Sequence, residues 1–146
     1  MMRPETQIIT LGVRDLEVSR RFYVDGLGWT PKLDVPGEVI FIQIGWGILL
    51  SLFAVDQLEE EAGGVAHGET APPIAFGHLV ESPDQVQQVI DRAAGVGGTE
   101  VAHATKRDWG GVSGYFADPD GFRWEVAWNP GFQISTDGDV QIGPVT

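Results

Sequence analysis

The chain has no cysteine among its 146 residues, which excludes disulfides, thiol nucleophiles and cysteine-ligated metals. It has no apolar run long enough to cross a bilayer, and residues 1–7 lack the apolar stretch of a secretory signal. We therefore expect a cytoplasmic protein with no membrane partner.

Basic residues are scarce. The 9 lysines and arginines against 21 aspartates and glutamates give a formal net charge of −12. Nucleic-acid binding needs a basic face, so a nucleic-acid partner is excluded. The acidity favours solubility, or a preference for cationic or neutral ligands. Much of the acid lies at Asp56 and residues 59–61, so this charge need not reach a binding site.

What the chain does contain is an internal repeat. Residues 41–53 have a counterpart at residues 115–127, each with a short apolar strand, a turn ending in glycine and a second strand. Phe41 and Tyr115 stand 74 positions apart, as do Ser51 and Glu125. A duplication of this kind predicts two modules of one architecture.

The two halves of the chain have similar predicted element orders, and the second half has one more strand between its helix and its hairpin. The first has a strand at 8–13, a helix capped by Asp15 and strands at 39–44 and 48–53. The helix carries one apolar stripe through Leu16, Ser19, Phe22, Tyr23 and Leu27. The second has a strand at 74–80, a helix opening at Ser82-Pro83-Asp84-Gln85, a strand near 100–104 and a hairpin at 113–127. We treat residues 1–146 as a single domain and divide it into a first module 7–54, a linker 55–72, a second module 73–128 and a C-terminal tail 129–146. The linker is expected to contain about one helical turn. In the tail, Asp137-Gly138 predicts a hairpin.

Alternation along the two hairpins separates a core face from a mixed face. The even-numbered residues are aliphatic or aromatic and are expected to face the helices; His78 falls on this side and is predicted to be a core histidine. The odd-numbered residues are mixed and predict a ligand-binding face. They are Phe41, Gln43, Leu49, Ser51 and Phe53 in the first hairpin, and Ser113, Tyr115, Ala117, Arg123, Glu125 and Ala127 in the second.

Two motifs resemble the vicinal-oxygen-chelate superfamily of glyoxalases, bleomycin-resistance proteins and extradiol dioxygenases. The first motif is Thr10-Leu11-Gly12-Val13-Arg14-Asp15-Leu16, followed by Phe22-Tyr23 and Gly26-Leu27-Gly28-Trp29. The second motif runs from Gly114 to Trp128. It contains the turn Asp118-Pro119-Asp120-Gly121, with Glu125 four residues after the glycine. The resemblance covers about residues 7 to 132. It implies an α+β fold of two tandem βαβββ modules, whose mixed sheets curl into a cup with the helices outside, usually in a homodimer.

The metal enzymes of this superfamily hold a divalent ion through four side chains, typically His and Glu. The resemblance places these positions on Ile8, Ser51, Ala75 and Glu125. Isoleucine and alanine have no donor atom, and a neutral serine is a poor ligand for such cations. The resemblance therefore implies the fold without its metal: no cofactor is expected, and no residue is assigned as a metal ligand.

Glu125 is the only acid on the predicted cup wall. We interpret it as a general base or as an anchor for a ligand donor; the alternatives are a salt bridge to Arg123 or an inherited remnant. Tyr115 is expected directly across the hairpin from Glu125, where it hydrogen-bonds to the carboxylate or stacks on a ligand. Trp109, in a glycine-rich loop, fits either a lid or a dimer contact.

We predict a glyoxalase/bleomycin-resistance-like protein that binds a small organic molecule in the cup without a catalytic metal. The alternative is an enzyme of the same superfamily, a lyase, isomerase or dioxygenase. Such an enzyme would be metal-dependent through unidentified ligands, or metal-free with Glu125 as general base beside Tyr115. The residues assigned to the ligand are Thr10, Phe41, Gln43, Leu49, Ser51, Phe53, Trp109, Tyr115, Arg123 and Glu125.

Overall fold

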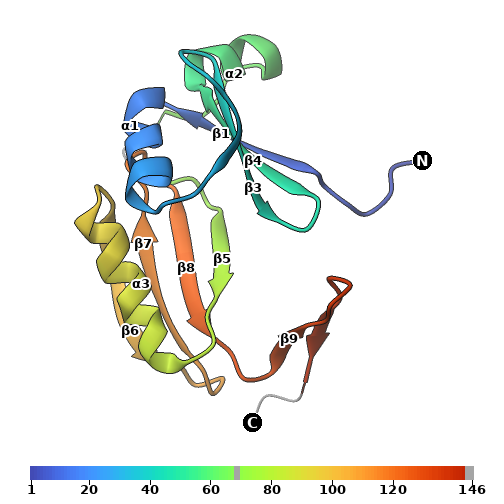
Figure 1. Ribbon diagram of the computed structural model, residues 1–146, viewed down its shortest axis with the longest axis vertical. Coiled ribbons are helices and arrows are strands. Elements are labelled where there is room, and N and C mark those ends of the chain that lie inside the picture. Colours follow the sequence, from blue (N-terminus) through green and yellow to red (C-terminus); the bar gives the residue numbers. More distant parts are fainter. Residues whose placement is uncertain (68–69, 144–146) are drawn as a thin grey trace. The chain divides into compact units, whose positions relative to one another are not determined.

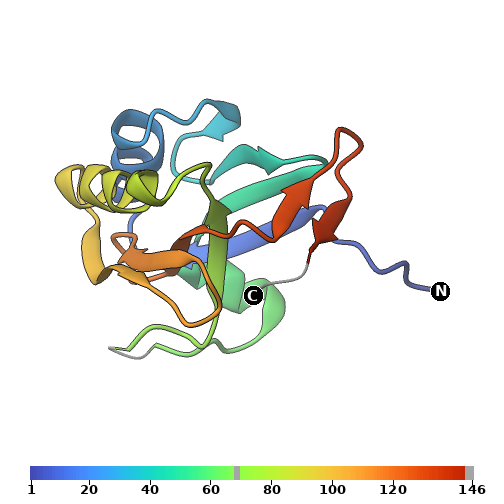
Figure 2. The ribbon, with the colours of Figure 1, turned by 90° about the horizontal axis from the view of Figure 1, so that it is seen from below.

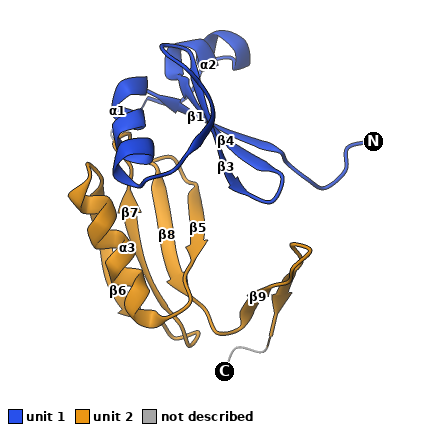
Figure 3. Ribbon diagram, viewed as in Figure 1, with its two compact units in different colours: residues 1–68 blue, residues 69–146 orange. Residues whose placement is uncertain are grey.

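The computed structural model describes residues 1–67 and 70–143; Gly68 and Glu69 of the predicted linker and residues 144–146 of the predicted tail lie outside the described residues. The chain divides into two compact units, Met1–Gly68 and Glu69–Thr146 (Figure 3). Each contains a four-stranded mixed sheet, with α1, η1 and α2 in the first unit and α3 in the second, and neither sheet is closed (Figure 1). This confirms the predicted α+β class and the repeated βαβββ order. No helix within the described ranges is long and apolar enough to span a membrane.

The first unit has a sheet in the order β1-β4-β3-β2, in which β1 is parallel to β4 and the other pairs are antiparallel. Helix α2 follows the sheet and is longer than the single turn expected for the linker. The elements are β1 (Ile8–Val13), α1 (Leu16–Arg20), the π-helix η1 (Arg21–Gly26), β2 (Pro31–Val35), β3 (Val39–Gly45), β4 (Ile48–Ala54) and α2 (Val55–Ala62).

Two adjacent aromatic residues explain the π-helix, where the sequence predicted a regular helix. Neighbours in an α-helix point about 100° apart, yet Phe22 and Tyr23 are both fully buried. In the wider π turn the N–H of Leu27 donates to the carbonyl of Phe22 at 2.8 Å, and both rings turn inward. The even-numbered face of the hairpin is the core face, as predicted, with Ile40, Ile42, Leu50 and Leu52 fully buried.

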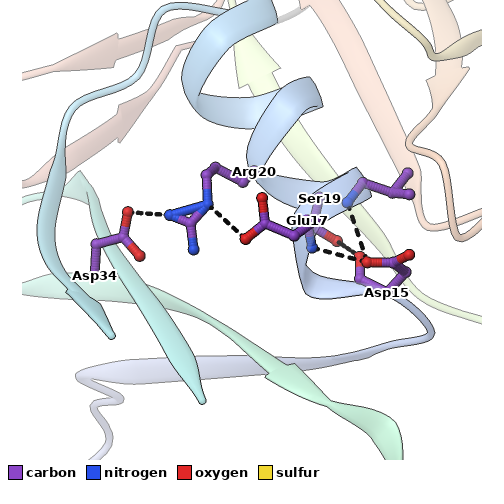
Figure 4. Close-up of polar contacts among 6 residues, drawn as sticks. Asp15, Glu17, Ser19, Arg20 and Asp34 are labelled. Carbon is purple, nitrogen blue, oxygen red and sulfur yellow. Dashed lines mark hydrogen bonds and ion pairs between the residues drawn. The ribbon is translucent and has the colours of Figure 1, made fainter. Parts of the chain in front are cut away.

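A chain of charges ties α1 to the edge strand β2 (Figure 4). Asp15 caps α1 as predicted, with its carboxylate accepting from the N–H of Glu17 at 2.9 Å. Arg20 donates to Glu17 at 3.2 Å and to the carboxylate of Asp34 on β2. The hydrogen bond from Arg20 to Asp34 raises the pKa of the guanidinium. These contacts hold the helix in place on the side of the sheet that the core occupies.

The second unit repeats the arrangement in the order β5-β8-β7-β6, and α3 lies along one face of this sheet (Figures 1 and 2). The capping box predicted at Ser82 and Gln85 is present. The predicted terminal hairpin is also present, as a separate two-stranded sheet. The elements are β5 (Ala75–Leu79), α3 (Pro83–Gly95), β6 (Thr99–Lys106), β7 (Val112–Ala117), β8 (Arg123–Trp128), β9 (Phe132–Ile134) and β10 (Val140–Ile142).

Glycine at position 114 lets α3 approach the sheet closely. A Cβ on Gly114 would lie 2.6 Å from Cδ1 of Ile90 and 2.8 Å from the carbonyl oxygen of Ala102. The helix buries Val86 and Ile90 against this face. The opposite face of the sheet, which carries Tyr115, is therefore the one that α3 leaves open.

The prediction of a core position for His78 is wrong. His78 pairs with the buried Val126 and so lies on the expected face, but its side chain is exposed. The reason is its strand: β5 is at the edge of the sheet, whereas α3 packs against β6, β7 and β8. Partial removal of the ring from water lowers the pKa of His78.

Candidate functional site

The six residues of the first unit that were assigned to a ligand share one face of its sheet. Thr10 pairs with Ser51, and Ser51 pairs with Phe41, so these three form one row across β1, β4 and β3. Thr10 is exposed, whereas Ser51 is buried between its neighbours. The remaining three are on the same face by the same register: Gln43, Leu49 and Phe53.

Two contacts restrict that face. The side-chain amide of Gln43 donates to the carbonyl of Gly45 at 3.0 Å, so it is bound to its own turn. Helix α2 covers the end of the face near Phe53, because Cδ2 of Leu58 lies 3.0 Å from where a Cβ on Gly12 would be. The sequence did not predict this cover. The first unit therefore offers few polar groups that are free to hold a ligand.

The equivalent row in the second unit is Gly77, Glu125 and Tyr115, on β5, β8 and β7. The hydroxyl of Tyr115 donates to Oε2 of Glu125 at 3.2 Å, which confirms that the two residues face each other across the hairpin. Both side chains are half-buried. The row thus presents a carboxylate and a phenol where the first unit has a serine and a phenylalanine.

A tight turn places Glu125 on β8. The buried carboxylate of Asp118 accepts from the N–H groups of Asp120 at 3.0 Å and Phe122 at 2.9 Å. Arg123 donates to the carbonyl of Gly121 at 3.1 Å. Within the described chain Arg123 therefore belongs to the turn and Glu125 to Tyr115, so the alternative of a salt bridge between Arg123 and Glu125 is wrong.

Open space lies beside Glu125. A Cβ on Gly77, the partner of Glu125 on β5, would have no atom within 4 Å. Ala75, two residues earlier on the same face, is small and exposed. A carboxylate next to such a gap has room for a bound molecule.

Arg107, in the loop before β7, is a residue that the sequence reasoning missed. Its Nε donates to the hydroxyl of Ser113 at 2.8 Å, and Ser113 is buried. Burial raises the pKa of Tyr115, the charge of Glu125 raises it further, and the charge of Arg107 acts in the opposite direction. An arginine in a glycine-rich loop was the available signal, but no periodicity tells which loop side chain reaches a neighbouring strand.

Trp109, which was predicted to be a lid over the ligand or a dimer contact, folds back on its own loop. Its ring occupies the space that a Cβ on Gly111 would need. The ring remains partly exposed. Its role in binding stays a prediction.

The four positions at which the resemblance places metal ligands do not fit a divalent ion. Ile8 and Ala75 supply no donor atom, and Ser51 supplies only a neutral hydroxyl. The fourth, Glu125, shares its carboxylate with Tyr115. Across residues 1–67 and 70–143, no group of three or more His, Cys, Asp or Glu side chains is arranged to hold a metal.

A separate hollow of about 410 Å³ lies on the C-terminal hairpin. Among the described residues that line it, the polar side chains are the amides of Gln133 and Gln141, and none is titratable. A neutral lining of this kind has no acid, base or charge with which to fix or change a ligand. The face of β7 and β8 is therefore the stronger candidate site.

Comparisons with known proteins agree with this fold. The family model described as Glyoxalase/Bleomycin resistance protein/Dioxygenase superfamily matches residues 7–126. A glyoxalase-related enzyme from Fulvimarina pelagi is 38% identical, with 97% of this chain and 99% of that chain covered and a TM-score of 0.85. A glyoxalase/bleomycin resistance protein/dioxygenase from Nocardioides is 25% identical, with 92% of each chain covered and a TM-score of 0.72. A lactoylglutathione lyase from Agrobacterium tumefaciens, at 22% identity over 88% of this chain and 96% of that chain, shares the fold with a TM-score of 0.66. No curated protein matches the chain.

Proposed function

The chain belongs to the Glyoxalase/Bleomycin resistance protein/Dioxygenase superfamily, and on that basis we propose that it binds a small organic molecule beside Glu125 without a catalytic metal. The observation that carries the proposal is the hydrogen bond between Tyr115 and Glu125 next to the open space over Gly77. A polar pair beside a gap is the arrangement that fixes the orientation of a ligand in a mostly apolar site.

The neighbours of this pair support a ligand site. Ala75 and Gly77 share the face beside Glu125 and are too small to fill it, and the larger Leu79 stands further along the same strand. Oε2 of Glu125 accepts from Tyr115, and Oε1 has no partner among the described residues, so it remains to receive a donor from a ligand. The side chains at the superfamily's other metal positions have no oxygen or nitrogen beyond one serine hydroxyl, which supports a function that needs no metal.

A second candidate function is catalysis, and the same hydrogen bond favours it. Glu125 is placed to take a proton from a bound molecule as a general base. Tyr115, whose pKa is raised chiefly by burial, stays protonated, and its single O–H would turn from Glu125 to the developing negative charge once Glu125 has taken up the proton. The relative from Fulvimarina pelagi, described as a glyoxalase-related enzyme, supports this candidate for the present chain. The reaction class would be a lyase, isomerase or dioxygenase reaction.

The binding proposal is tested by filling the space beside Glu125. Gly77→Val adds a side chain where no atom lies within 4 Å and where the glycine has no positive φ, so the fold is expected to tolerate it. Binding of small aromatic compounds, followed by NMR shifts at Tyr115 and Glu125, is expected to weaken about tenfold or more. The matched control is Gly45→Val in the first unit, where a Cβ also meets nothing within 4 Å.

Two further measurements separate the candidates. A stoichiometric divalent metal in the purified protein, lost in Glu125→Ala, would overturn the proposal of a metal-free site. Turnover of 2-oxoaldehyde hemithioacetals or catechols, lost in Glu125→Gln, would favour the enzyme over simple binding. The homodimer that the resemblance implies is part of the proposal, and light scattering of the purified chain measures it.

A further inference from the structure

Among the described residues, contacts hold one edge of the Arg107 guanidinium. Nε donates to the hydroxyl of Ser113 at 2.8 Å, and Nη2 donates to the carbonyl of the same residue at 3.3 Å. Arginine carries five N–H donors in a flat, rigid fork, so the outer edge formed by Nη1 and the second hydrogen of Nη2 remains. In the described part of the chain Nη1 has no hydrogen bond and is not among the buried atoms that lack a partner, so it keeps some contact with solvent.

This outer edge lies on the same face as the Tyr115–Glu125 pair. Ser113 and Tyr115 are two residues apart on β7 and so point to the same side of the sheet. Across from them on β8 are Ala127 and Glu125. Ala127 is buried and ends in a methyl group, so it offers the guanidinium no donor or acceptor from that strand. A cation, a phenol and a carboxylate therefore follow one another along this face, and the charge of Arg107 is felt at Tyr115.

Building on the proposed binding function, we propose that Arg107 determines specificity and that the ligand is a small organic carboxylate. Its carboxylate would lie on the Nη1–Nη2 edge of Arg107, and a hydroxyl or amino group would donate to the free oxygen of Glu125. The two N–H groups of that edge match the two coplanar oxygens of a carboxylate. A phosphate dianion is disfavoured, because one planar edge leaves its third oxygen unpaired near Glu125 on a chain of net charge −12.

The test uses the full chain and three related probes: mandelate, methyl mandelate without the charge, and phenylacetate without the hydroxyl. Wild-type protein is expected to bind mandelate about tenfold more tightly than either of the others. In Arg107→Gln the preference for mandelate over its ester is expected to disappear, with about tenfold or greater loss for mandelate alone. Arg92→Gln removes an equal charge from α3, on the covered side of the sheet, and is expected to change nothing.

Arg107→Lys keeps the charge and removes the planar edge, so it serves if the glutamine variant does not fold. It is expected to lose most of the mandelate preference and to keep ester binding. If both Arg107 variants retain the preference, or if neutral compounds bind at Tyr115 and Glu125 with no carboxylate preference, this inference is overturned and the proposed binding function stands. If no compound of a wider neutral, cationic and anionic panel perturbs Tyr115 or Glu125, both fail.

Discussion

The two units repeat one backbone plan and place different chemistry on its open face. The row in the first unit is Thr10, Ser51 and Phe41, and the equivalent row in the second unit is Gly77, Glu125 and Tyr115. In the first unit α2 covers part of the face, and the row carries no charge. In the second unit the row carries a hydrogen-bonded carboxylate beside open space. The repeated register thus fixes where side chains stand but not what they do.

The core faces of the two units also differ at equivalent positions. Ile40 of the first unit corresponds to Gly114 of the second by the same spacing as Phe41 and Tyr115. Ile40 is fully buried, whereas the place of its side chain in the second unit is taken by Ile90 of α3. At this position the core is filled by a strand residue in the first unit and by a helix residue in the second. We therefore expect a smaller side chain at position 40 to destabilise the first unit, and a larger side chain at position 114 to destabilise the second.

The largest effect is expected from Ile40→Ala. Removing a fully buried isoleucine side chain leaves a cavity, which costs about 2–5 kcal/mol of unfolding free energy. The matched control is Ile8→Ala, because Ile8 is 51% exposed and its loss is expected to cost much less. Urea unfolding followed by tryptophan fluorescence measures both. Equal losses in the two variants would mean that the first unit is not packed around this residue.

Gly114→Ala is expected to cost about 1–3 kcal/mol, because even a methyl group would collide with Ile90 and with the backbone of β6. Gly77→Ala is the control in the same sheet: its Cβ meets nothing, so no loss of stability is expected. The same urea experiment applies. A Gly114→Ala variant as stable as the wild-type protein would show that α3 does not pack closely against β7.

Much of this architecture followed from alternation and the repeat, because strand periodicity assigns side chains to faces independently of distant contacts. The pairing of Tyr115 with Glu125 is of this kind. His78 shows the limit: alternation gave its face correctly, but not that β5 is an edge strand without a covering helix. The same holds for Arg107, whose direction is set by one contact with Ser113 that leaves no periodic pattern.

Helical patterns failed for a related reason. The stripe through Phe22 and Tyr23 was consistent with a regular helix, yet two adjacent buried rings required a π turn. The length of helix α2 was underestimated, and its contact with Gly12 was not predicted, because that contact joins residues that are distant in the sequence. Both cases were decided by packing against a partner, which local propensity does not contain.

Asp118→Ala is expected to cost about 1–2 kcal/mol, because it removes the acceptor of two backbone N–H groups in the turn before β8. The equivalent turn of the first unit has no such carboxylate and carries the exposed Trp46 instead. Trp46→Ala is therefore the matched control, with little expected change. Thermal unfolding compares the two, and ligand binding at Glu125 is expected to weaken in Asp118→Ala alone if the turn positions that residue.

The smallest effect concerns the hydroxyl group of Tyr115, which its counterpart Phe41 in the first unit lacks. The pKa of Tyr115 is raised above 10.0 by burial first and then by Glu125, so the folded chain holds this proton more tightly than the unfolded chain. The resulting stabilisation is complete below pH 10 and is lost as the pH rises through the folded pKa. Tyr115→Phe is therefore expected to lose less stability than the wild-type protein above pH 10.

Absorbance of tyrosinate, taken as the difference between wild type and Tyr115→Phe, isolates this titration from that of Tyr23. Glu125→Gln is expected to lower the midpoint, because a charge that opposes ionisation is removed, while burial keeps it above 10.0. Arg107→Gln is expected to raise it, because a favourable cation is removed. Opposite shifts in these two variants require both charges to act on the Tyr115 hydroxyl. The first unit has Phe41 at the equivalent position, so it has no equivalent titration. Shifts of the same sign would separate Arg107 from the face on which Tyr115 and Glu125 stand.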